Sequence, residues 1–284
     1  MKNLVSAREL LTWMDEKENV FLFDCRFDLM DKNYGRDAYE REHIKGAYPI
    51  DLDRDLVGEK GPHGGRQPFR DAESLRAYIE RFGVNDDSVV VAYDDGDMQG
   101  AGRLYFQLRQ LGLKNVYALD GGLKAYRALG GETETGAAGK IAAKGHITTE
   151  EDRSFIVDME YVRSKLDDED TVLLDARAKN RYLGLEEPVD KKMGHIPGAK
   201  SYYFRDVLTD DEHAEGSFLP EEALREHFGD LAPDKELILY CGSGVSLCVN
   251  ALALDKIGRS YKIYPGSFSD WISYEDNEIR TEEE

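Results

Sequence analysis

The chain has 284 residues, 41% of them hydrophobic, and its 57 Asp and Glu against 37 Lys and Arg give a net charge of −20 at pH 7. This length predicts about two domains with an ample core, and the composition excludes disordered, collagen-like and membrane-embedded classes. Because so negative a protein repels phosphate backbones and anionic lipids, we expect neither a nucleic-acid nor a membrane partner.

The three cysteines, Cys25, Cys241 and Cys248, are odd in number and far apart. This spacing supports neither a disulfide framework nor a paired set of zinc ligands, so we expect a reducing compartment and no metal. The first twenty residues carry scattered charges, and no apolar run approaches the roughly 18 residues that span a bilayer. A cytoplasmic location is the resulting prediction.

Short apolar strands alternate along the chain with helical stretches. Strands are predicted within Val20–Arg26, Ser88–Tyr93, Asn115–Leu119, Thr171–Arg177, Glu236–Tyr240 and Tyr261–Tyr264. Helices are predicted over Ala7–Glu16, Ala72–Phe82, Gly100–Gln110, Met159–Lys165, Glu221–Phe228 and Val245–Lys256. Continuous apolar strands between helices are typical of an α/β fold, in which a mainly parallel sheet carries helices on both faces.

The second half of the chain repeats the first. The stretch VFLFDCR at Val20–Arg26 matches TVLLDAR at Thr171–Arg177, and His43–Ala47 and His195–Ala199 follow at nearly the same spacing. The sequence therefore predicts two copies of one α/β domain, at residues 1–131 and 151–284. A linker rich in Gly, Ala and Thr is expected at residues 132–150.

The two copies differ in chemistry at one equivalent position. Asp94 follows the middle strand of the first copy, and Cys241 follows the matching strand of the second. Ligands bind at the carboxyl ends of the strands in open parallel sheets. We therefore expect a nucleophile in the second copy only, at Cys241.

The loop after Cys241 contains two glycines and leads into an apolar helix. Such a loop can point several backbone N–H groups at its centre, and the helix adds the positive end of its dipole. These groups favour a thiolate over a thiol, and they would equally stabilise a persulfide anion. The residues expected around the sulfur are Gly242, Ser243, Gly244, Val245 and Ser246.

The other candidate groups are expected to be structural. Cys25 stands where the second copy has an alanine, and Cys248 lies among Leu and Val on the predicted helix, so both are expected in the core. Both copies keep a histidine and an acid–arginine pair, whereas only one copy has the cysteine. The histidines, His43 and His195, are therefore expected to hold turns. The acids, Asp24 and Asp175, are expected to form buried ion pairs with their arginines.

Together these motifs resemble the tandem-domain sulfurtransferases of the rhodanese family over nearly the whole chain. The motifs are DCR and DAR, HIKGA and HIPGA, LDGG at 119–122, RYLG at 181–184 and the CGSGVS loop. The resemblance implies two tandem rhodanese-like domains, of which the first has Asp in place of the cysteine. It also implies a ping-pong transfer through a Cys241 persulfide, with no metal or organic cofactor.

A phosphatase is disfavoured. Rhodanese-like domains resemble dual-specificity phosphatases, which need an arginine after five intervening residues because phosphoryl oxygens require a bidentate guanidinium. That position here is Leu247.

The resemblance points to 3-mercaptopyruvate as the sulfur donor, with thiosulfate as the alternative. CGSGVS is similar to the CGSGVT loop of mercaptopyruvate enzymes, whereas thiosulfate enzymes tend to place cationic side chains just after the cysteine. Arg181 matches the family arginine that binds the donor's anionic end, and it suits either donor. Mercaptopyruvate enzymes carry a second arginine some nine residues after the first, and this sequence has no arginine near Asp190. Lys191 or Lys192 could take the place of that arginine, or either could be a solvated surface charge.

A mercaptopyruvate donor leaves as an enolate and needs a proton. The resemblance maps the family's proton relay onto Ser243, His63 and Asp53; the alternative for His63 is an incidental histidine in a glycine-rich surface loop. Ser267, Phe268 and Trp271 are expected either to wall the pocket or to close the core.

The leading prediction is thus an enzyme that moves a sulfane sulfur from 3-mercaptopyruvate to a thiol or cyanide acceptor, with a thioredoxin-like protein among the candidate thiols. Thiosulfate:cyanide sulfur transfer by the same mechanism is the first alternative. A sulfur-carrier or partner-binding module loaded by a desulfurase is the second. A non-catalytic structural protein is the weakest, because it leaves the exchange of Asp94 for Cys241 unexplained.

Overall fold

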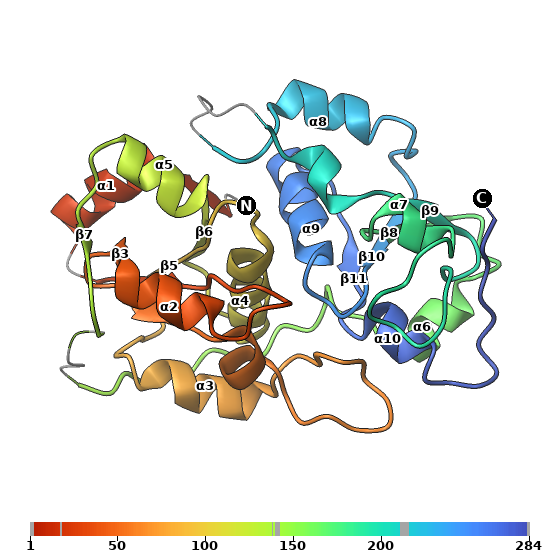
Figure 1. The fold of residues 1–284 in the computed structure, drawn as a ribbon, viewed down its shortest axis with the longest axis horizontal. Coiled ribbons are helices and arrows are strands. Elements are labelled where there is room, and N and C mark those ends of the chain that lie inside the picture. The colour runs from red at the N-terminus through yellow and green to blue at the C-terminus, as the bar shows by residue number, and fades with distance from the viewer. Residues whose placement is uncertain (1–2, 18, 138, 140–142, 211–215, 283–284) are drawn as a thin grey trace. The chain divides into compact units, whose positions relative to one another are not determined.

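The computed structural model describes residues 3–17, 19–137, 139, 143–210 and 216–282 (Figure 1). The chain divides into two compact units, each described here by itself. The first unit comprises Met1–Val57, Arg70–Asp152 and Thr209–Phe218, and the second comprises Gly58–Phe69, Arg153–Leu208 and Leu219–Glu284. The segment that contains His63 therefore belongs to the unit of Cys241, although it lies in the first half of the sequence.

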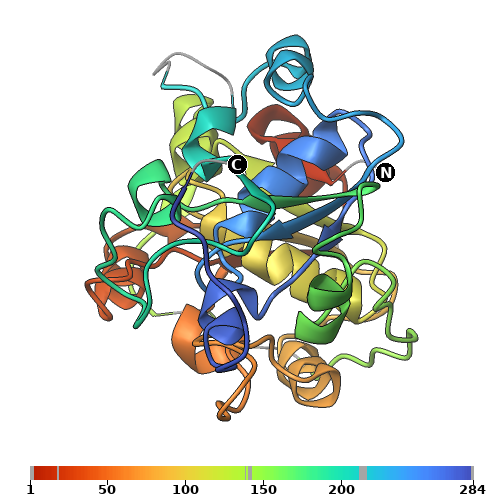
Figure 2. The same cartoon turned by 90° about the vertical axis from the view of Figure 1, so that its right-hand side faces the viewer.

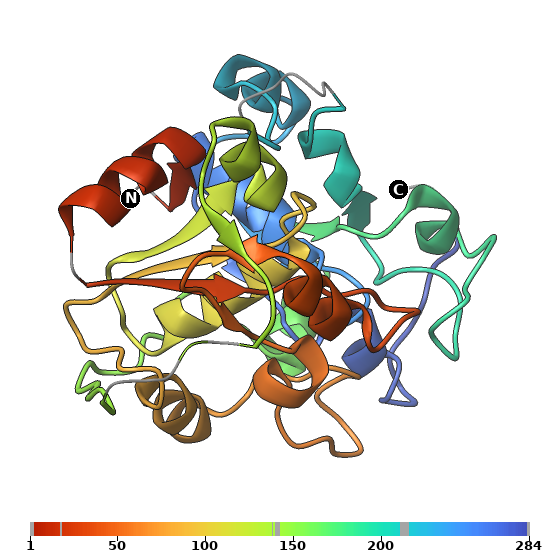
Figure 3. The same cartoon turned by 60° about the vertical axis from the view of Figure 1, so that its left-hand side comes forward.

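The first unit is built around a five-stranded parallel sheet in the order β1-β6-β5-β2-β4. Its strands are β1 (Leu4–Ser6), β2 (Val20–Asp24), β4 (Tyr48–Pro49), β5 (Val89–Tyr93) and β6 (Val116–Asp120). Its helices are α1 (Ala7–Glu16), α2 (Tyr34–Arg41), the single-turn η1 (Leu52–Leu56), α3 (Ala72–Glu80), α4 (Gln99–Gln110) and α5 (Gly122–Ala128). Helices α1 and α5 lie side by side in Figures 1 and 3.

Both faces of this sheet are buried. Val91 and Tyr93 of β5 join the core that α1 and α5 help to form, and the alternate residues Val90 and Ala92 are also fully buried. Helix α4 packs on β5 and β6. Strands covered on both faces need continuous apolar sequence, which is why the sequence shows no polar alternation there.

The second unit repeats this arrangement with a four-stranded parallel sheet in the order β11-β10-β8-β9. Its strands are β8 (Thr171–Asp175), β9 (Ala199–Ser201), β10 (Glu236–Tyr240) and β11 (Lys262–Ile263). Its helices are α6 (Met159–Ser164), α7 (Lys179–Tyr182), η2 (Phe204–Val207), α8 (Glu221–His227), α9 (Leu247–Lys256) and α10 (Ser267–Trp271). Helix α9, drawn in blue in Figures 1 and 2, packs against β10.

Four strands of the first sheet, in the order β6-β5-β2-β4, correspond to the four strands of the second, in the order β11-β10-β8-β9. A parallel bridge between Ile156 and Ile263 takes the place in the second unit that the pairing of β1 with β6 takes in the first. The predicted α/β class, with two copies of one mainly parallel sheet, is confirmed.

Local sequence explains where the helices begin. Ser6 and Glu9 form a capping box at the N-terminus of α1. Ser6 Oγ accepts from the Glu9 N–H at 3.3 Å, and the Ser6 N–H donates to Glu9 Oε2 at 3.1 Å. Helix α9 begins at Leu247, two residues later than predicted. The delay follows from Gly244, whose φ of 77° keeps the preceding loop curled. Helices α2, α5, α7 and α10 lie outside the predicted helices.

Each copy ends its first long strand in a buried ion pair, as predicted. Asp24 Oδ2 lies 2.6 Å from Arg26 Nη2, and Asp175 Oδ2 lies 2.6 Å from Arg177 Nη2. Arg177 Nη2 also donates to the Gly194 carbonyl at 2.7 Å, which ties the strand end to the segment before His195.

His43 and His195 have the same buried setting in the two units. Their Nδ1 atoms lie 2.7 Å from the carbonyls of Tyr39 and Tyr182, respectively. Each ring stacks on the same tyrosine with the centroids 3.7 Å apart. The predicted role of holding turns is confirmed for both.

Part of the expected linker packs against the first unit. It contains the short strand β7 (Thr133–Glu134), which pairs antiparallel with β3 (His43–Ile44). Ile147 is buried, and its N–H donates to Glu80 Oε1 at 2.9 Å. Residues 138 and 140–142 of the expected linker lie outside the described residues. Across the described part of the chain, none of the helices is both long and apolar enough to cross a membrane.

Candidate active site around Cys241

Cys241 lies directly after β10, at the carboxyl end of the second sheet, and is 1% exposed. Its Sγ accepts a hydrogen bond from the Gly244 N–H at 3.1 Å. Its own N–H donates at 3.1 Å to Ser267 Oγ, which lies 3.8 Å from the sulfur. The loop thus curls around the sulfur as the two glycines predicted.

The pKa of the Cys241 thiol is lowered, although burial by itself raises it. The Ser246 hydroxyl, the N–H groups of Leu247 and Ser243, and the Ser267 hydroxyl all favour the charged form, and together they outweigh burial. The sulfur is therefore a thiolate, and a nucleophile, at lower pH than an ordinary cysteine.

The other two cysteines lack this setting. Burial, followed by the negative charge of Asp24, raises the pKa of Cys25 well above its ordinary value. Cys25 Sγ lies 3.6 Å from the Phe23 carbonyl, and Cys248 Sγ lies 3.7 Å from the Gly244 carbonyl, so both thiols face acceptors. Both cysteines are buried, as predicted.

Two guanidinium groups lie against the loop at Gly242. A Cβ placed on Gly242 would stand 3.1 Å from Arg66 Nη2, and 3.4 and 3.6 Å from Nη2 and Nη1 of Arg181. Burial and the neighbouring Arg181 lower the pKa of Arg66, whereas the charge of Cys241 acts in the opposite sense. A pair of guanidinium groups beside a thiolate suits an anionic donor.

Arg181 was expected at this site, but Arg66 was not. The sequence signal was a cation directly after two glycines, in the same segment as His63. Gly65 has a φ of 85°, and a Cβ there would meet the Gly266 carbonyl oxygen at 2.5 Å. Glycine therefore lets the backbone approach closely enough for the Arg66 N–H to donate to Ser269 Oγ at 3.0 Å.

Two carboxylates hold the guanidinium pair. Glu187 accepts from Arg181 Nη2 at 2.8 Å, and Asp190 accepts from Arg181 Nη2 at 2.9 Å. Asp190 also accepts from Arg66 Nη1, and its side chain is 1% exposed. Arg66 thus lies beside Arg181 as a second cation at the loop, whereas the sequence offered Lys191, which is exposed, or Lys192, which is half-buried.

Ser243 and His63, both expected in the proton relay, have other hydrogen-bond partners. Ser243 Oγ donates instead to Gln67 Oε1 at 2.7 Å, and this glutamine is buried. His63 is exposed; its Nδ1 lies 2.8 Å from Ser273 Oγ, and its ring stacks on Tyr274 with the centroids 4.0 Å apart. The alternative interpretation, a histidine on a glycine-rich surface loop, fits this setting better.

Asp53, the third expected member of the relay, belongs to the first unit. It lies in η1 and its side chain is exposed.

The segment after β11 both supports the cysteine and closes the core. Ser267 has a φ of 57°, unusual for a residue with a side chain, and this conformation accompanies its contact with Cys241. Phe268 lies under the Arg177 guanidinium, with the CZ atom 4.0 Å from the ring centroid. Trp271 is fully buried and donates to the Glu278 carbonyl at 2.8 Å.

Asp94 occupies the equivalent position in the first unit. Its Oδ1 accepts from the Gly96 and Met98 N–H groups at 2.9 and 3.2 Å, and its Oδ2 accepts from the Ala101 N–H at 3.0 Å. The cradle of N–H groups is therefore filled by the protein's own carboxylate, whose pKa burial raises in spite of these donors.

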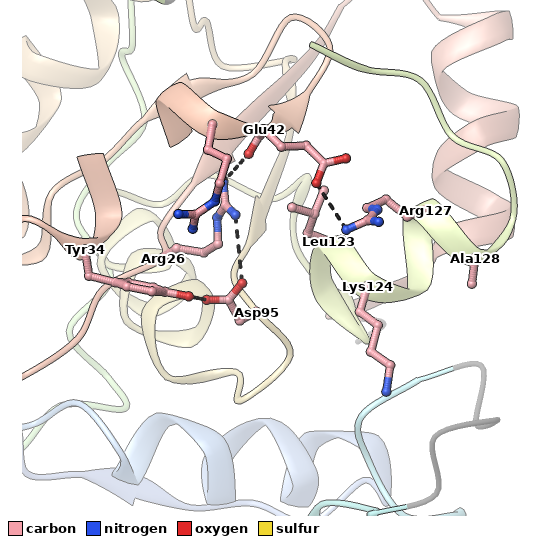
Figure 4. A pocket seen from close by; sticks show the side chains of 9 residues that line it. Arg26, Tyr34, Glu42, Asp95, Leu123, Lys124, Arg127 and Ala128 are labelled. Atoms are coloured by element: carbon pink, nitrogen blue, oxygen red, sulfur yellow. Dashed lines mark hydrogen bonds and ion pairs between the residues drawn. The ribbon is translucent and has the colours of Figure 1, made fainter. Parts of the chain in front are cut away.

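A polar pocket of about 520 Å³ opens at the carboxyl end of the first unit's sheet (Figure 4). The Tyr34 hydroxyl donates to Asp95 Oδ2 at 2.6 Å, and Arg127 Nη1 lies 3.1 Å from Glu42 Oε2. Its lining contains no cysteine, so it lacks the chemistry of the Cys241 loop. The described residues contain no cluster of three or more His, Cys, Asp or Glu side chains that could hold a metal ion.

Comparisons with known proteins agree with this architecture. The protein family described as "Rhodanese-like domain" matches this chain twice, over residues 6–129 and 158–274. The chain is 39% identical over 277 residues to a Pseudomonas aeruginosa protein named "Probable 3-mercaptopyruvate sulfurtransferase", and the match covers 95% of each chain. It is 32% identical over 256 residues to the thiosulfate sulfurtransferase of Cricetulus griseus, covering 86% of this chain and 82% of that protein.

The fold is also that of a solved structure. The Tum1 protein from Saccharomyces cerevisiae superposes with a TM-score of 0.86 at 22% identity, and the match covers 99% of both chains. The matched segments coincide with the two sheets, and the second contains the cysteine loop. The chain therefore belongs to the rhodanese-like family and is a tandem-domain sulfurtransferase.

Proposed function

We propose that the chain moves a sulfane sulfur from 3-mercaptopyruvate to cyanide or a thiol through a persulfide on Cys241. The observation that carries this proposal is the buried Cys241, with a lowered thiol pKa, beside the guanidinium groups of Arg66 and Arg181. The donor's carboxylate binds the guanidinium groups while its sulfur meets Sγ. The name of the Pseudomonas aeruginosa relative supports this choice of donor.

In the first step the Cys241 thiolate attacks the sulfur of the donor. An S–S bond forms and the donor's C–S bond breaks, with its electron pair going to carbon to give the enolate of pyruvate. In the second step, a cyanide ion or thiolate attacks the outer sulfur, the S–S bond breaks, and the Cys241 thiolate is regenerated. The products are thiocyanate or an acceptor persulfide.

The protons of the first step balance internally. The donor thiol brings one proton to the nascent persulfide, and the enolate needs one to become pyruvate. Ser243 is the proposed relay between them, since its hydroxyl belongs to the cysteine loop. Its partner Gln67 cannot supply a proton, because an amide side chain does not titrate.

Thiosulfate is the second candidate donor, and the pairing of Ser243 with Gln67 favours it. Attack on its outer sulfur releases sulfite with the electron pair of the broken S–S bond, and no proton is required. The same thiolate and guanidinium groups serve both donors.

The proposed acceptors include cyanide, low-molecular-weight thiols and a thioredoxin-like protein, and the proposed setting is the cytoplasm. Three free, buried cysteines support a reducing compartment.

The test mixes the reduced protein with 3-mercaptopyruvate or with thiosulfate, each with and without cyanide, and follows intact mass together with thiocyanate. We expect a gain of one sulfur, about 32 Da, that cyanide removes. Cys241→Ser should abolish the gain, and Cys248→Ser is the matched control that should keep it. If neither donor adds mass, the protein-loaded sulfur carrier becomes the better explanation.

A further inference from the structure

Asp190 carries out a function that the sequence pattern did not suggest. Its carboxylate accepts hydrogen bonds from Arg66 Nη1 and from Arg181 Nη2, the latter at 2.9 Å. Arg66 and Arg181 come from segments 115 residues apart, and Asp190 holds them side by side. Its side chain is 1% exposed, so solvent screens these contacts little.

The contact with Asp190 also fixes how the two guanidinium groups lie beside the loop. It engages one terminal nitrogen of each guanidinium, and a Cβ placed on Gly242 would stand 3.1 Å from Arg66 Nη2, 3.4 Å from Arg181 Nη2 and 3.6 Å from Arg181 Nη1. Two N–H donors on neighbouring guanidinium groups match the two oxygens of one carboxylate.

The net charge of the side chains around the donor site bears on which donor binds there. The charges of Arg66 and Arg181 are cancelled by those of Asp190 and Glu187, both 1% exposed at their side chains. Arg177 is paired with Asp175 in the same way. With Cys241 in the thiolate form that attacks the donor, these seven groups together carry one net negative charge before a donor enters.

We propose that Asp190 is a positioning residue that sets donor selectivity, favouring a monoanionic carboxylate donor over the thiosulfate dianion. Because Coulomb repulsion scales with the product of the charges, a dianion entering a negative site is opposed about twice as strongly as a monoanion. Asp190 thus offsets the attraction that two guanidinium groups offer to thiosulfate. This inference rests on the proposed function, since it concerns the donor of the same site.

The test compares kcat/KM for 3-mercaptopyruvate and for thiosulfate, with cyanide as acceptor and at one ionic strength. Asp190→Asn removes the charge and keeps the shape, and Asp190→Ser is a second neutral variant. We expect the thiosulfate to mercaptopyruvate ratio to rise about tenfold in both, mainly through a lower KM for thiosulfate. Asp190→Glu retains the charge and should restore the wild-type ratio.

Glu186→Gln is the matched control, because Glu186 is an exposed acid of the same segment. It changes the net charge of the protein by the same amount and should leave the donor ratio unchanged. Equal losses with both donors in Asp190→Asn and Asp190→Ser, or an unchanged ratio, would overturn the proposal.

Inert anions separate this inference from the proposed function. We expect calorimetry to show that pyruvate binds the wild-type protein more tightly than sulfate, and that Asp190→Asn strengthens sulfate binding several-fold more than pyruvate binding. If the wild-type protein forms no persulfide with either donor, the proposed function fails, and anion binding still decides the role of Asp190. Equal effects on both anions would reject charge selection.

Discussion

Hydrogen-bond donors, rather than burial, distinguish Cys241 from Cys25. Cys25 and Cys241 are both almost completely buried, yet the pKa of the first thiol is raised and that of the second is lowered. Cys25 Sγ faces the Phe23 carbonyl and is close enough to Asp24 to feel its negative charge, whereas Cys241 faces N–H and O–H donors. The polarity of the immediate neighbours therefore decides whether each sulfur is charged.

The Ser267 hydroxyl should be one of the groups that keep Cys241 ionised. Ser267→Gly removes the hydroxyl and accepts the positive φ without strain, so we expect the pKa of the Cys241 thiol to rise by about one unit. The rate of Cys241 alkylation by iodoacetamide should fall as the pH decreases through the pKa of the thiol. This fall should occur at a higher pH in the variant than in the wild type. An unchanged alkylation profile would show that the backbone N–H groups suffice.

Gly242 should be required for donor binding rather than for the nucleophile. In Gly242→Ala the new methyl group stands 3.1 Å from Arg66 Nη2, so the guanidinium groups must shift by a few tenths of an ångström. We expect KM for both donors to rise by roughly tenfold, with the alkylation profile of Cys241 unchanged. Gly61→Ala, where the nearest atom lies at 3.5 Å, is the control and should have wild-type KM.

At the scale of elements, the same strand–loop–helix unit serves opposite purposes in the two copies. After β10 the loop surrounds the Cys241 sulfur, and after β5 the equivalent loop surrounds the Asp94 carboxylate. Both use backbone N–H groups at the start of the following helix, because those groups have no partner within the helix. The second copy encloses the sulfur of Cys241, and the first copy uses the buried carboxyl group of Asp94 to complete the fold.

Asp94 should therefore stabilise the first unit. Asp94→Ala leaves the N–H groups of Gly96, Met98 and Ala101 without their carboxylate, and we expect the free energy of unfolding to fall by about 1–3 kcal/mol. Urea denaturation followed by tyrosine and tryptophan fluorescence measures this change. Asp37→Ala, at an exposed position of α2, should alter stability by less than about 0.5 kcal/mol. Equal stability of the two variants would contradict the cradle interpretation.

At the scale of the whole molecule, salt screens the surface charge more than it screens the donor site. The protein carries a net charge of −20, and its donor site contains a pair of guanidinium groups whose charges Asp190 and Glu187 balance. Repulsion from exposed carboxylates acts over a Debye length of about 10 Å at 0.1 M salt and is readily screened, whereas the buried contacts are screened much less. Added salt should therefore screen the repulsion between the exposed carboxylates and the donor before it weakens the buried contacts.

We expect kcat/KM for thiosulfate to rise two- to five-fold when KCl is raised from about 10 to 150 mM at constant pH. The rise should be smaller for 3-mercaptopyruvate, because it carries one negative charge instead of two. Initial-rate measurements with uncharged sucrose at matched osmolality provide the control. A fall in kcat/KM with salt would mean that the local guanidinium groups dominate the approach of the donor.

Much of this protein could be predicted from the order of its residues alone. Apolar strands, Ser6 at a helix start and glycines at turns act through neighbours in the chain, so periodicity and turn chemistry predicted the duplicated α/β fold. The exchange of Asp94 for Cys241 at a strand end predicts a nucleophile in the second copy. These features follow from local preferences and from the internal repeat.

The tertiary structure decided which side chains meet around the Cys241 loop. Arg66, Gln67 and Asp190 come from segments far from Cys241, and the segment 58–69 packs with the second unit although it lies in the first half of the chain. Motif position favoured His63 as the partner of Ser243, whereas the backbone places Gln67 there and turns His63 toward Ser273. Local patterns predict elements, but the convergence of distant loops depends on how those elements pack.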